Sequence, residues 1–515
     1  MMLVATAVVW LGVSLPVSSP AQPTESGDSG GTVGVIYRSS VSQYGITWTF
    51  DRAYPSGQFA NGDYWVLGPV QIVMMTPPAT SGRNGWMVNP VGFTQGYDNR
   101  TQLNGASPVY NAALQPRLPY VANPGSSVIK AISVDPTLAT CRPCLKTAAV
   151  LTVVGSVPPE NGRSTFRPPY FGTAKPMIST ASMRLDLLPS LVPPQSEGPI
   201  ESLSALTDRF KRVQLDHVLP TWLGDNMHPA DNMPNYGASI GRDTGDAALR
   251  LMLNEPLKTK LPAVITYVQY GIDTYYTLLG GMKWLGEGGH GNGRKLPITF
   301  AAVLLDDPAM KRAVSEGPAT KSFGEDDQVY FSSRANGGSG QVLWGAECTE
   351  AQYWTKITTN NGRRDCRDPY GYVDGGGAEI GQAYQFCCTS KEWKGTALAL
   401  HLMPGLGVVW NNPYFMLYVD RWVNFGVWAQ PDPCMLEPRP KLNGKCLLGS
   451  GRFLSKNGSS KDSGYYGSPF ADSMWQAYRE WPSGVGCRPL PSAGIVSQLL
   501  RRWSCSMMIG LGWRG

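Results

Sequence analysis

The sequence predicts an α+β multidomain protein, with an N-terminal antiparallel β-sandwich followed by a helical domain. Three observations support this prediction. From residue 32 to 160, short alternating segments are separated by Gly, Pro and Asn, as in a β-sandwich. From 201 to 428, apolar residues recur at helical spacing and strand patterns are few. A chain of 515 residues also exceeds one ordinary hydrophobic core, so more than one domain is expected.

Three segments carry the strand prediction. The stretch "YGITWTFDRAY" alternates apolar and polar residues, "GDYWVLGPVQIVMM" is β-branched and aromatic, and "LKTAAVLTVVGSV" is apolar enough for a buried strand. Turn residues such as Asn61-Gly62 and Pro124-Gly125 lie between them. Residues 161–200 are rich in proline and predict a stiff connector between the two domains.

The helical prediction depends on segments such as "LKTKLPAVITYVQYGIDTYYTLL". Seven of its positions fall on one helix face: Leu261, Val264, Ile265, Val268, Ile272, Tyr275 and Leu279. A second segment, "GRKLPITFAAVLLDDPAMKRAV", places Pro297 near a helix start, where proline is tolerated. Successive helices joined by variable loops predict helical hairpins over 201–428. Residues 429–515 are rich in Gly, Ser and Pro, and we expect one packed segment there, "GYYGSPFADSMWQAYREW".

The N-terminus predicts export of the protein. Residues 3–17 are apolar and Ser19-Pro20-Ala21 is a small-residue cleavage site, so 1–21 is expected to be a signal peptide, although no Lys or Arg precedes Arg38. No later run is long and apolar enough to span a bilayer. The expected location is therefore extracellular or periplasmic. The net charge of +6 is not clustered, which argues against nucleic acid as a partner.

The ten cysteines suit an oxidising compartment. Cys141 and Cys144 form a C-x-x-C motif, but no second such motif and no histidine pair stands at zinc-ligand spacing. We therefore expect disulfides or buried thiols, with no metal site and no cofactor.

The first candidate site is the loop "GEGGHGNGRKLPITF", which runs from 286 to 300. It offers Glu287, His290, Asn292, Arg294 and Lys295 just before a predicted helix. Polar loops before helices bind anionic ligands, because free N–H groups and the helix dipole point outward there. The glycines predict a close approach between this backbone and a substrate, although a plain turn would also use them.

Three further clusters complete the candidate site. The loop "GDNMHPADNMPNYG" offers His228, Asp231, Asn232 and Tyr236 before another helix, and helix capping is its simplest alternative role. The connector "STFRPPYFGT" and the segment "GQAYQFCCTSKEW" add candidate substrate-binding residues: Arg167, Tyr170 and Tyr384.

These residue types fit the β-elimination of an acidic polysaccharide. The reaction needs a base to take the proton beside the uronate carboxylate and an acid to protonate the leaving oxygen. It also needs cations or amides that neutralise the carboxylate. We expect His290 or His228 as base and Tyr236 as acid. The expected neutralising and substrate-binding groups are Arg294, Asn232, Asn292 and Lys295.

Two other functions fit the sequence. Hydrolysis of a glycosidic bond needs two carboxyl groups across the scissile bond. Glu287 and Asp231 are the first candidates for that pair, and Asp243 or Asp246 could also serve. The third function is a non-catalytic carbohydrate-binding surface protein, which the abundant aromatic residues would suit.

The combination of an aromatic β-sandwich, a helical-hairpin domain and an Asn, His, Tyr and Arg set resembles the secreted polysaccharide lyases built on an incomplete α/α toroid. The resemblance is one of architecture and of residue types. Here the β part precedes the helices, and Asn292 follows His290 by two positions. The resemblance implies a toroid-like fold for 201–428, a catalytic cleft along it and a uronate-containing polysaccharide as substrate.

Overall fold

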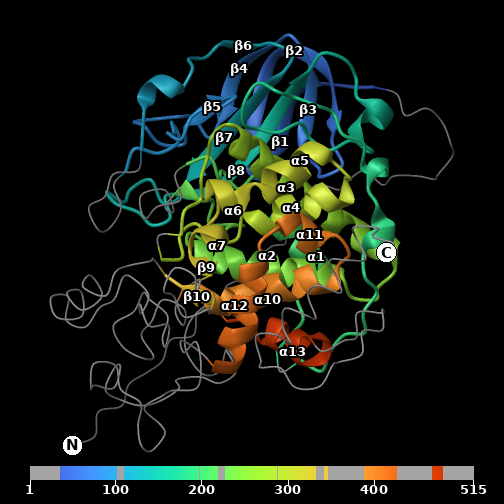
Figure 1. Ribbon diagram of the computed structural model, residues 1–515. Coiled ribbons are helices and arrows are strands. Elements are labelled where there is room, and N and C mark those ends of the chain that lie inside the picture. The colour runs from blue at the N-terminus through green and yellow to red at the C-terminus, as the bar shows by residue number, and fades with distance from the viewer. Residues whose placement is uncertain are drawn as a thin grey trace, which may run out of the picture. The chain divides into compact units, whose positions relative to one another are not determined.

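The computed structural model describes residues 35–100, 109–196, 198–218, 227–286, 288–331, 342–345, 388–425 and 467–479. All of them belong to one unit of the chain, Val35–Gly515. The predicted signal peptide, 1–21, lies outside the described residues. These residues combine a sheet with a helical region, so the α+β class is confirmed (Figure 1).

Eight strands form one curled sheet in the order β5-β7-β8-β3-β2-β4-β6, with β1 paired to β2. The pairs are antiparallel except β3–β8, which is parallel, so the prediction of a wholly antiparallel sheet is wrong at that pair. The two-sheet sandwich stays a prediction. The strands are β1 (Ile36–Gln43), β2 (Ile46–Gln58), β3 (Tyr64–Leu67), β4 (Val70–Thr76), β5 (Trp86–Val88), β6 (Tyr120–Ala122), β7 (Ser126–Ser133) and β8 (Leu145–Val154).

Strand β8 confirms the buried strand predicted at "LKTAAVLTVVGSV". Successive side chains of a strand point to opposite faces, and both faces of β8 are buried. Leu151 and Val153 pack with Trp48 of β2 inside the curl of the sheet. Val150 faces the other way and packs with Tyr170 of the connector. A strand buried on both faces has apolar side chains on both of them, which explains why residues 148–151 and 153–154 do not alternate with charged residues.

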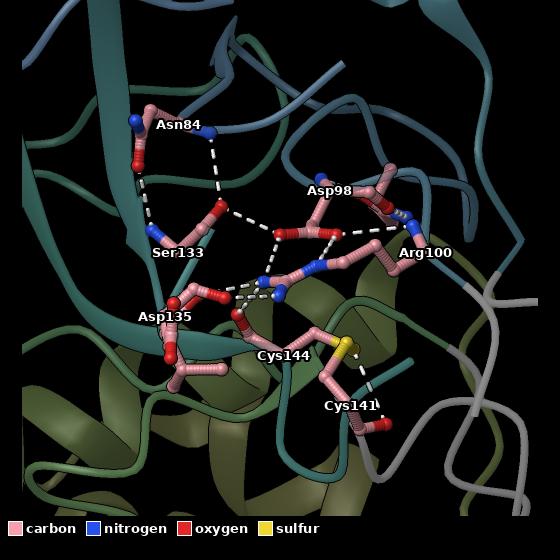
Figure 2. Close-up of a disulfide and its surroundings, with 9 residues drawn as sticks. Asn84, Asp98, Arg100, Ser133, Asp135, Cys141 and Cys144 are labelled. Atoms are coloured by element: carbon pink, nitrogen blue, oxygen red, sulfur yellow. Dashed lines mark hydrogen bonds and ion pairs between the residues drawn. A yellow bond between two sulfur atoms is a disulfide. The ribbon is translucent and has the colours of Figure 1, made fainter. Parts of the chain in front are cut away.

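The loop between β7 and β8 carries a disulfide, Cys141–Cys144. Beside it, the buried Arg100 side chain donates from Nε and Nη2 to the two carboxylate oxygens of Asp98. The guanidinium also donates to the carbonyls of Val134, Asp135 and Cys144 (Figure 2). This cluster, which we call the Arg100 clamp, fixes the entrance to β8.

The helical region contains ten described helices and one short hairpin. The helices are α1 (Leu203–Phe210), α2 (Gly237–Leu251), α3 (Leu257–Leu279), α4 (Lys295–Leu304), α5 (Pro308–Ser315), α6 (Gly317–Thr320), α7 (Gly324–Asp327), α10 (Ser390–Leu402), α11 (Leu406–Trp410) and α12 (Pro413–Phe425). In this hairpin the paired strands are β9 (Val329–Phe331) and β10 (Val342–Trp344), which run antiparallel. An eleventh helix, α13 (Pro469–Tyr478), lies in the segment predicted at "GYYGSPFADSMWQAYREW" and packs on α2 and α10.

Helix α3 lies at the centre of the helical region. Its predicted apolar face is buried from Val264 to Tyr275, whereas Leu279 at its end is exposed. The opposite face is buried as well, because α1 and α4 pack against α3. Glycine makes the α3–α4 contact close, since a Cβ on Gly271 would clash with the carbonyl of Pro297. The toroid arrangement stays a prediction.

Arg167 joins the connector to both regions. Its guanidinium is buried and pairs with Asp63, 2.6 Å away in the turn before β3, and with Asp273 of α3. Nearby, the backbone N–H of Tyr170 also donates to Asp273. Because both carboxylates come from different elements, this pairing ties sheet, connector and helix together.

Within the described part of the chain, no helix has the length and apolar character needed to cross a membrane.

Candidate functional site

The loop 288–294 lies against the protein's own backbone. A Cβ on Gly289 would meet the carbonyl of Cys388 and come within 2.7 Å of the Tyr236 hydroxyl. Gly293 has φ of +92°, and a Cβ there would clash with the backbone N of Gly241 in α2. The glycines therefore do permit a close approach, but the described contacts are with other segments of this chain.

His290 and Tyr236 meet at this loop. Their ring centroids are 4.7 Å apart and the rings stand nearly perpendicular, at 86°. Tyr236 is the residue before α2 and His290 precedes α4, so two helix starts bring the pair together. Both residues are partly exposed. Of the predicted base and acid candidates, these two have their rings in contact and reach solvent.

Arg294 contacts the backbone of His290 and is fully buried. Its Nη1 donates to the carbonyls of His290, at 2.9 Å, and Asn292, at 2.8 Å. Its Nε and Nη2 donate to Asp216, each at 3.0 Å. Arg294 was expected to neutralise a substrate carboxylate, but its contacts give it the task of holding the loop in place.

His228 belongs to the same buried network. Its Nδ1 lies 3.0 Å from the carbonyl of Pro234, and a carbonyl only accepts, so Nδ1 carries a proton. Its Nε2 lies 3.5 Å from Asp216. The ring is buried, so a substrate would not reach it, and His228 belongs to the buried network that holds the loop. His290 is partly exposed and is therefore the better placed of the two predicted bases.

Asp216, which the sequence analysis did not select, is the centre of this network. Burial by itself would raise the pKa of its carboxyl group. Arg294, His228 and Tyr270 outweigh burial and lower that pKa to about 2. The Tyr270 hydroxyl donates to Asp216 at 2.7 Å. Its position in "VQLDHVL" gave no signal of burial.

Asn292 and the next residue, Gly293, each contact a buried carboxyl group that was also missed. Its Nδ2 donates to Glu392 Oε1 at 2.8 Å, and the next backbone N–H, of Gly293, donates to Glu325 Oε1 at 2.8 Å. Burial raises the pKa of Glu325 to about 7 and raises that of Glu392 well above its usual range. The run of three acids in "FGEDDQ", next to apolar residues, was the available signal.

Lys295 is buried and used internally. Its Nζ donates to Asp326 at 2.7 Å and to the Trp410 carbonyl at 2.8 Å, and it lies 4.2 Å from the Trp410 ring centroid. Burial lowers the pKa of Lys295, and Asp326 opposes that effect. These contacts place the predicted substrate-binding Lys295 in the packing between α4, α7 and α11.

The other predicted residues divide into four groups. Tyr170 is buried and its hydroxyl lies 3.2 Å from His217 Nδ1, while Arg167 makes the pairing described above. Asn232 donates to backbone carbonyls of residues 209 and 212. Asp231 is exposed and pairs with Arg212 at 2.8 Å. Glu287 and Tyr384 lie outside the described residues.

Asp243 and Asp246, the second candidates for the carboxyl pair of a hydrolase, are both bonded to neighbouring side chains. Asp243 is buried and pairs with Arg209 and Arg242. Asp246 accepts a hydrogen bond from Ser468 at 2.7 Å, and burial raises its pKa to about 7. Both residues lie on α2, one turn apart, rather than facing each other from separate elements.

One group has the geometry of a metal site, because Asp98, Cys141 and Cys144 bring their ligand atoms within 4.8 Å of one another. The two sulfurs share a disulfide, so neither is the thiolate that a metal would need. Asp98 is occupied by Arg100 and by Ser133 Oγ at 2.5 Å. In this form the group does not fit a metal ion.

No family model, no curated protein and no solved structure matches this chain.

Proposed function

We propose that the protein is a carbohydrate-active enzyme that cleaves a uronate-containing polysaccharide by β-elimination. The single observation that carries the proposal is the pair of His290 and Tyr236. Their rings are in contact at 4.7 Å, both are partly exposed, and they come from two loops that precede helices. Imidazole and phenol are both side chains that act as positioned acids or bases in enzymes.

In the proposed reaction His290 is the base. It takes the proton from the carbon beside the uronate carboxylate, and a carbon–carbon double bond forms as the glycosidic carbon–oxygen bond breaks. Tyr236 donates its proton to the leaving oxygen. The products are one chain with a new hydroxyl group and one with an unsaturated uronate, and both side chains regain their starting protonation by exchange with water.

The buried network supports this assignment by fixing one member of the pair. The Arg294 guanidinium bonds to the His290 carbonyl and is itself held by Asp216. A catalytic group held by a rigid, buried support stays within reach of its substrate atom. In this proposal Arg294 is a positioning residue.

A screen of acidic polysaccharides tests the proposal. The folded protein is incubated with alginate, pectate, glucuronan, hyaluronan and ulvan, and ultraviolet absorbance of the unsaturated product is followed. Absorbance that rises on one polymer supports β-elimination and identifies the substrate class. New reducing ends without absorbance would favour the hydrolase alternative. Neither signal on a folded protein would favour the carbohydrate-binding alternative.

Matched variants then test the two residues. His290→Ala and Tyr236→Phe are each expected to lower kcat by about 10²–10⁴-fold, the usual contribution of a positioned acid or base. His401→Ala and the exposed Tyr37→Phe are the controls and should keep full activity. Full turnover in either His290→Ala or Tyr236→Phe, with an unchanged melting temperature, would rule out that residue's role.

A further inference from the structure

The loop 288–294 and its neighbours contain buried oxygen atoms without hydrogen-bond donors. Asn292 Oδ1, Glu325 Oε2 and Glu392 Oε2 each lack a hydrogen-bond partner, and the three residues are 0%, 1% and 2% exposed. A buried carboxylate oxygen without a donor, a cation or a proton is strongly destabilising. Two such carboxyl oxygens and one amide oxygen, in three residues linked by hydrogen bonds, point to a common explanation.

The three residues are linked through Asn292 and its neighbour Gly293. Asn292 Nδ2 is bonded to Glu392 Oε1, which leaves the other oxygen of each group unpaired. The backbone N–H of Gly293 reaches Glu325 Oε1 in the same way. A Cβ on Gly324 would lie 2.5 Å from Asn292 Oδ1, so this amide oxygen points against the start of α7, next to Glu325. The Glu325 charge in turn raises the pKa of Glu392.

Three cationic side chains in this part of the fold are bound to other carboxylates. Lys295 pairs with Asp326, and Arg294 pairs with Asp216. Arg242 of α2, whose charge acts on Glu392, pairs with Asp243. Among the described residues, Glu325 and Glu392 therefore have no ion-pair partner, whereas the adjacent Asp326 has one.

We propose that Asn292, Glu325 and Glu392 bind a hard divalent cation, with Ca²⁺ as the first candidate. An amide oxygen and two carboxylates are the ligands that Ca²⁺, Mg²⁺ and Mn²⁺ prefer, and no sulfur or imidazole is among them. Ca²⁺ tolerates irregular arrangements of oxygen ligands, which suits a site assembled from a loop and two helices. Two carboxylates would balance the charge of the ion.

The bound ion would connect three segments that are distant in sequence. The loop 288–294 would be tied through Asn292 to α7 and α10, and His290 lies two residues before Asn292. This proposal does not depend on the proposed reaction, since a cation that fixes this loop would do so in an enzyme or in a binding protein. The competing state is a pair of protonated, neutral carboxyl groups.

Cation binding is measured directly on the full chain. The protein is treated with EDTA, freed of the chelator, and titrated with Ca²⁺, Mg²⁺ and Mn²⁺ while the melting temperature is recorded. A second titration uses Tb³⁺ alone, whose luminescence is excited through nearby tryptophan, and buried Trp393 follows Glu392 directly. We expect at least one divalent cation to raise the melting temperature and Tb³⁺ emission to saturate.

Variants of the ligands separate the two states. Glu325→Gln and Glu392→Gln should each weaken cation binding at least tenfold, while Asn292→Asp, which keeps the oxygen and adds charge, should bind as tightly or more tightly. The exposed Asp186→Asn is the control and should leave binding unchanged. Opposite effects from amide and acid substitutions could not come from a general loss of folding.

Two results would overturn the proposal. The first is a wild-type protein whose melting temperature responds neither to EDTA nor to any of the three divalent cations. The second is a wild-type affinity in both glutamine variants. Either result, with glutamine variants as stable as the wild type, would identify Glu325 and Glu392 as protonated carboxyl groups.

Discussion

The buried acids of the Arg100 clamp and those beside the loop 288–294 differ in how fully their oxygens are hydrogen-bonded. In the clamp, both oxygens of Asp98 are bonded to Arg100, and Ser133 adds a further donor. Beside the loop, Glu325 of α7 and Glu392 of α10 each accept one hydrogen bond from an uncharged N–H group of the loop. The two regions belong to the same chain and are equally buried, so the difference lies in their charge balance.

This contrast separates structural support from binding capacity. A buried ion pair whose hydrogen bonds are all made fixes a local conformation. It has no free acceptor or donor atom with which to bind a ligand. A buried carboxyl group with one oxygen unpaired needs a proton or a cation from outside the chain. We therefore assign the clamp a structural role and place the capacity for a ligand at the loop.

The largest expected effect is on the clamp. Arg100→Ala leaves Asp98 buried without its counter-charge, which should lower the free energy of unfolding by about 3–5 kcal/mol. The measurement is urea denaturation followed by tryptophan fluorescence. A loss below about 1 kcal/mol would show that solvent reaches Asp98. The clamp would then no longer differ from the loop in having a buried, fully paired acid.

The second prediction concerns Asp216, which Arg294, His228 and Tyr270 surround. Its pKa is lowered to about 2 in the folded protein, against an ordinary value of 3.8. Its stabilising contribution is thus complete above about pH 4 and is lost as the pH falls through 2, an effect of about 2 kcal/mol. Urea midpoints between pH 2 and 5 measure it. In Asp216→Asn this part of the acid dependence should disappear, and an unchanged dependence would contradict the assignment.

The third prediction tests the disulfide beside the clamp. Replacing Cys141 and Cys144 together with Ser opens a very short loop, for which chain entropy predicts a loss of about 1–2 kcal/mol. The double variant should still fold, because Arg100 continues to hold Asp98 and three carbonyls. Calorimetry of the variant gives the value, and a failure to fold would mean that the clamp depends on the disulfide.

The smallest effect is expected for an exposed pair. Arg184 and Asp186 are bonded at 2.8 Å, but their side chains are 50% and 62% exposed. Water screens such a pair, so Arg184→Ala should leave the urea midpoint unchanged within error. A clear loss at this position would mean that distance, rather than burial, decides the strength of ion pairs in this protein.

The local pattern of the sequence predicted much of the fold. The run at 145–157 and the helical period at 257–279 depend on neighbouring residues, and both elements formed as expected. The parallel β3–β8 pair was not predictable, because pairing partners are chosen over long separations. The sequence of helix α3 predicted one apolar face, whereas both faces are buried. The burial of the second face was not predictable either, because it depends on α1 and α4, which are distant in sequence.

The candidate site was predictable in part. The glycines of the loop did indicate a close approach, and His290 and Tyr236 were selected from residue type alone. Glu392 was not, because its contact with Asn292 spans 100 positions and a glutamate in a helix is usually solvated. Arg294 and Lys295 were selected as groups that contact a substrate, and in the structure they bond to Asp216 and Asp326, because sequence does not tell whether a cation faces a substrate or a buried acid.

The parallel pair β3–β8 also bears on how the protein is made. The ribosome releases the N-terminal residues first, and at about 5–20 residues per second several seconds pass before β8 follows β3 out of the exit tunnel. During that time the edge of β3 that pairs with β8 has no partner strand. Trp65 and Val66, which are fully buried beside β8 in the folded protein, lie on this strand. An unpaired strand edge is a template for aggregation, so slower synthesis or early release of the chain should favour aggregates in which β3 pairs with the wrong strand.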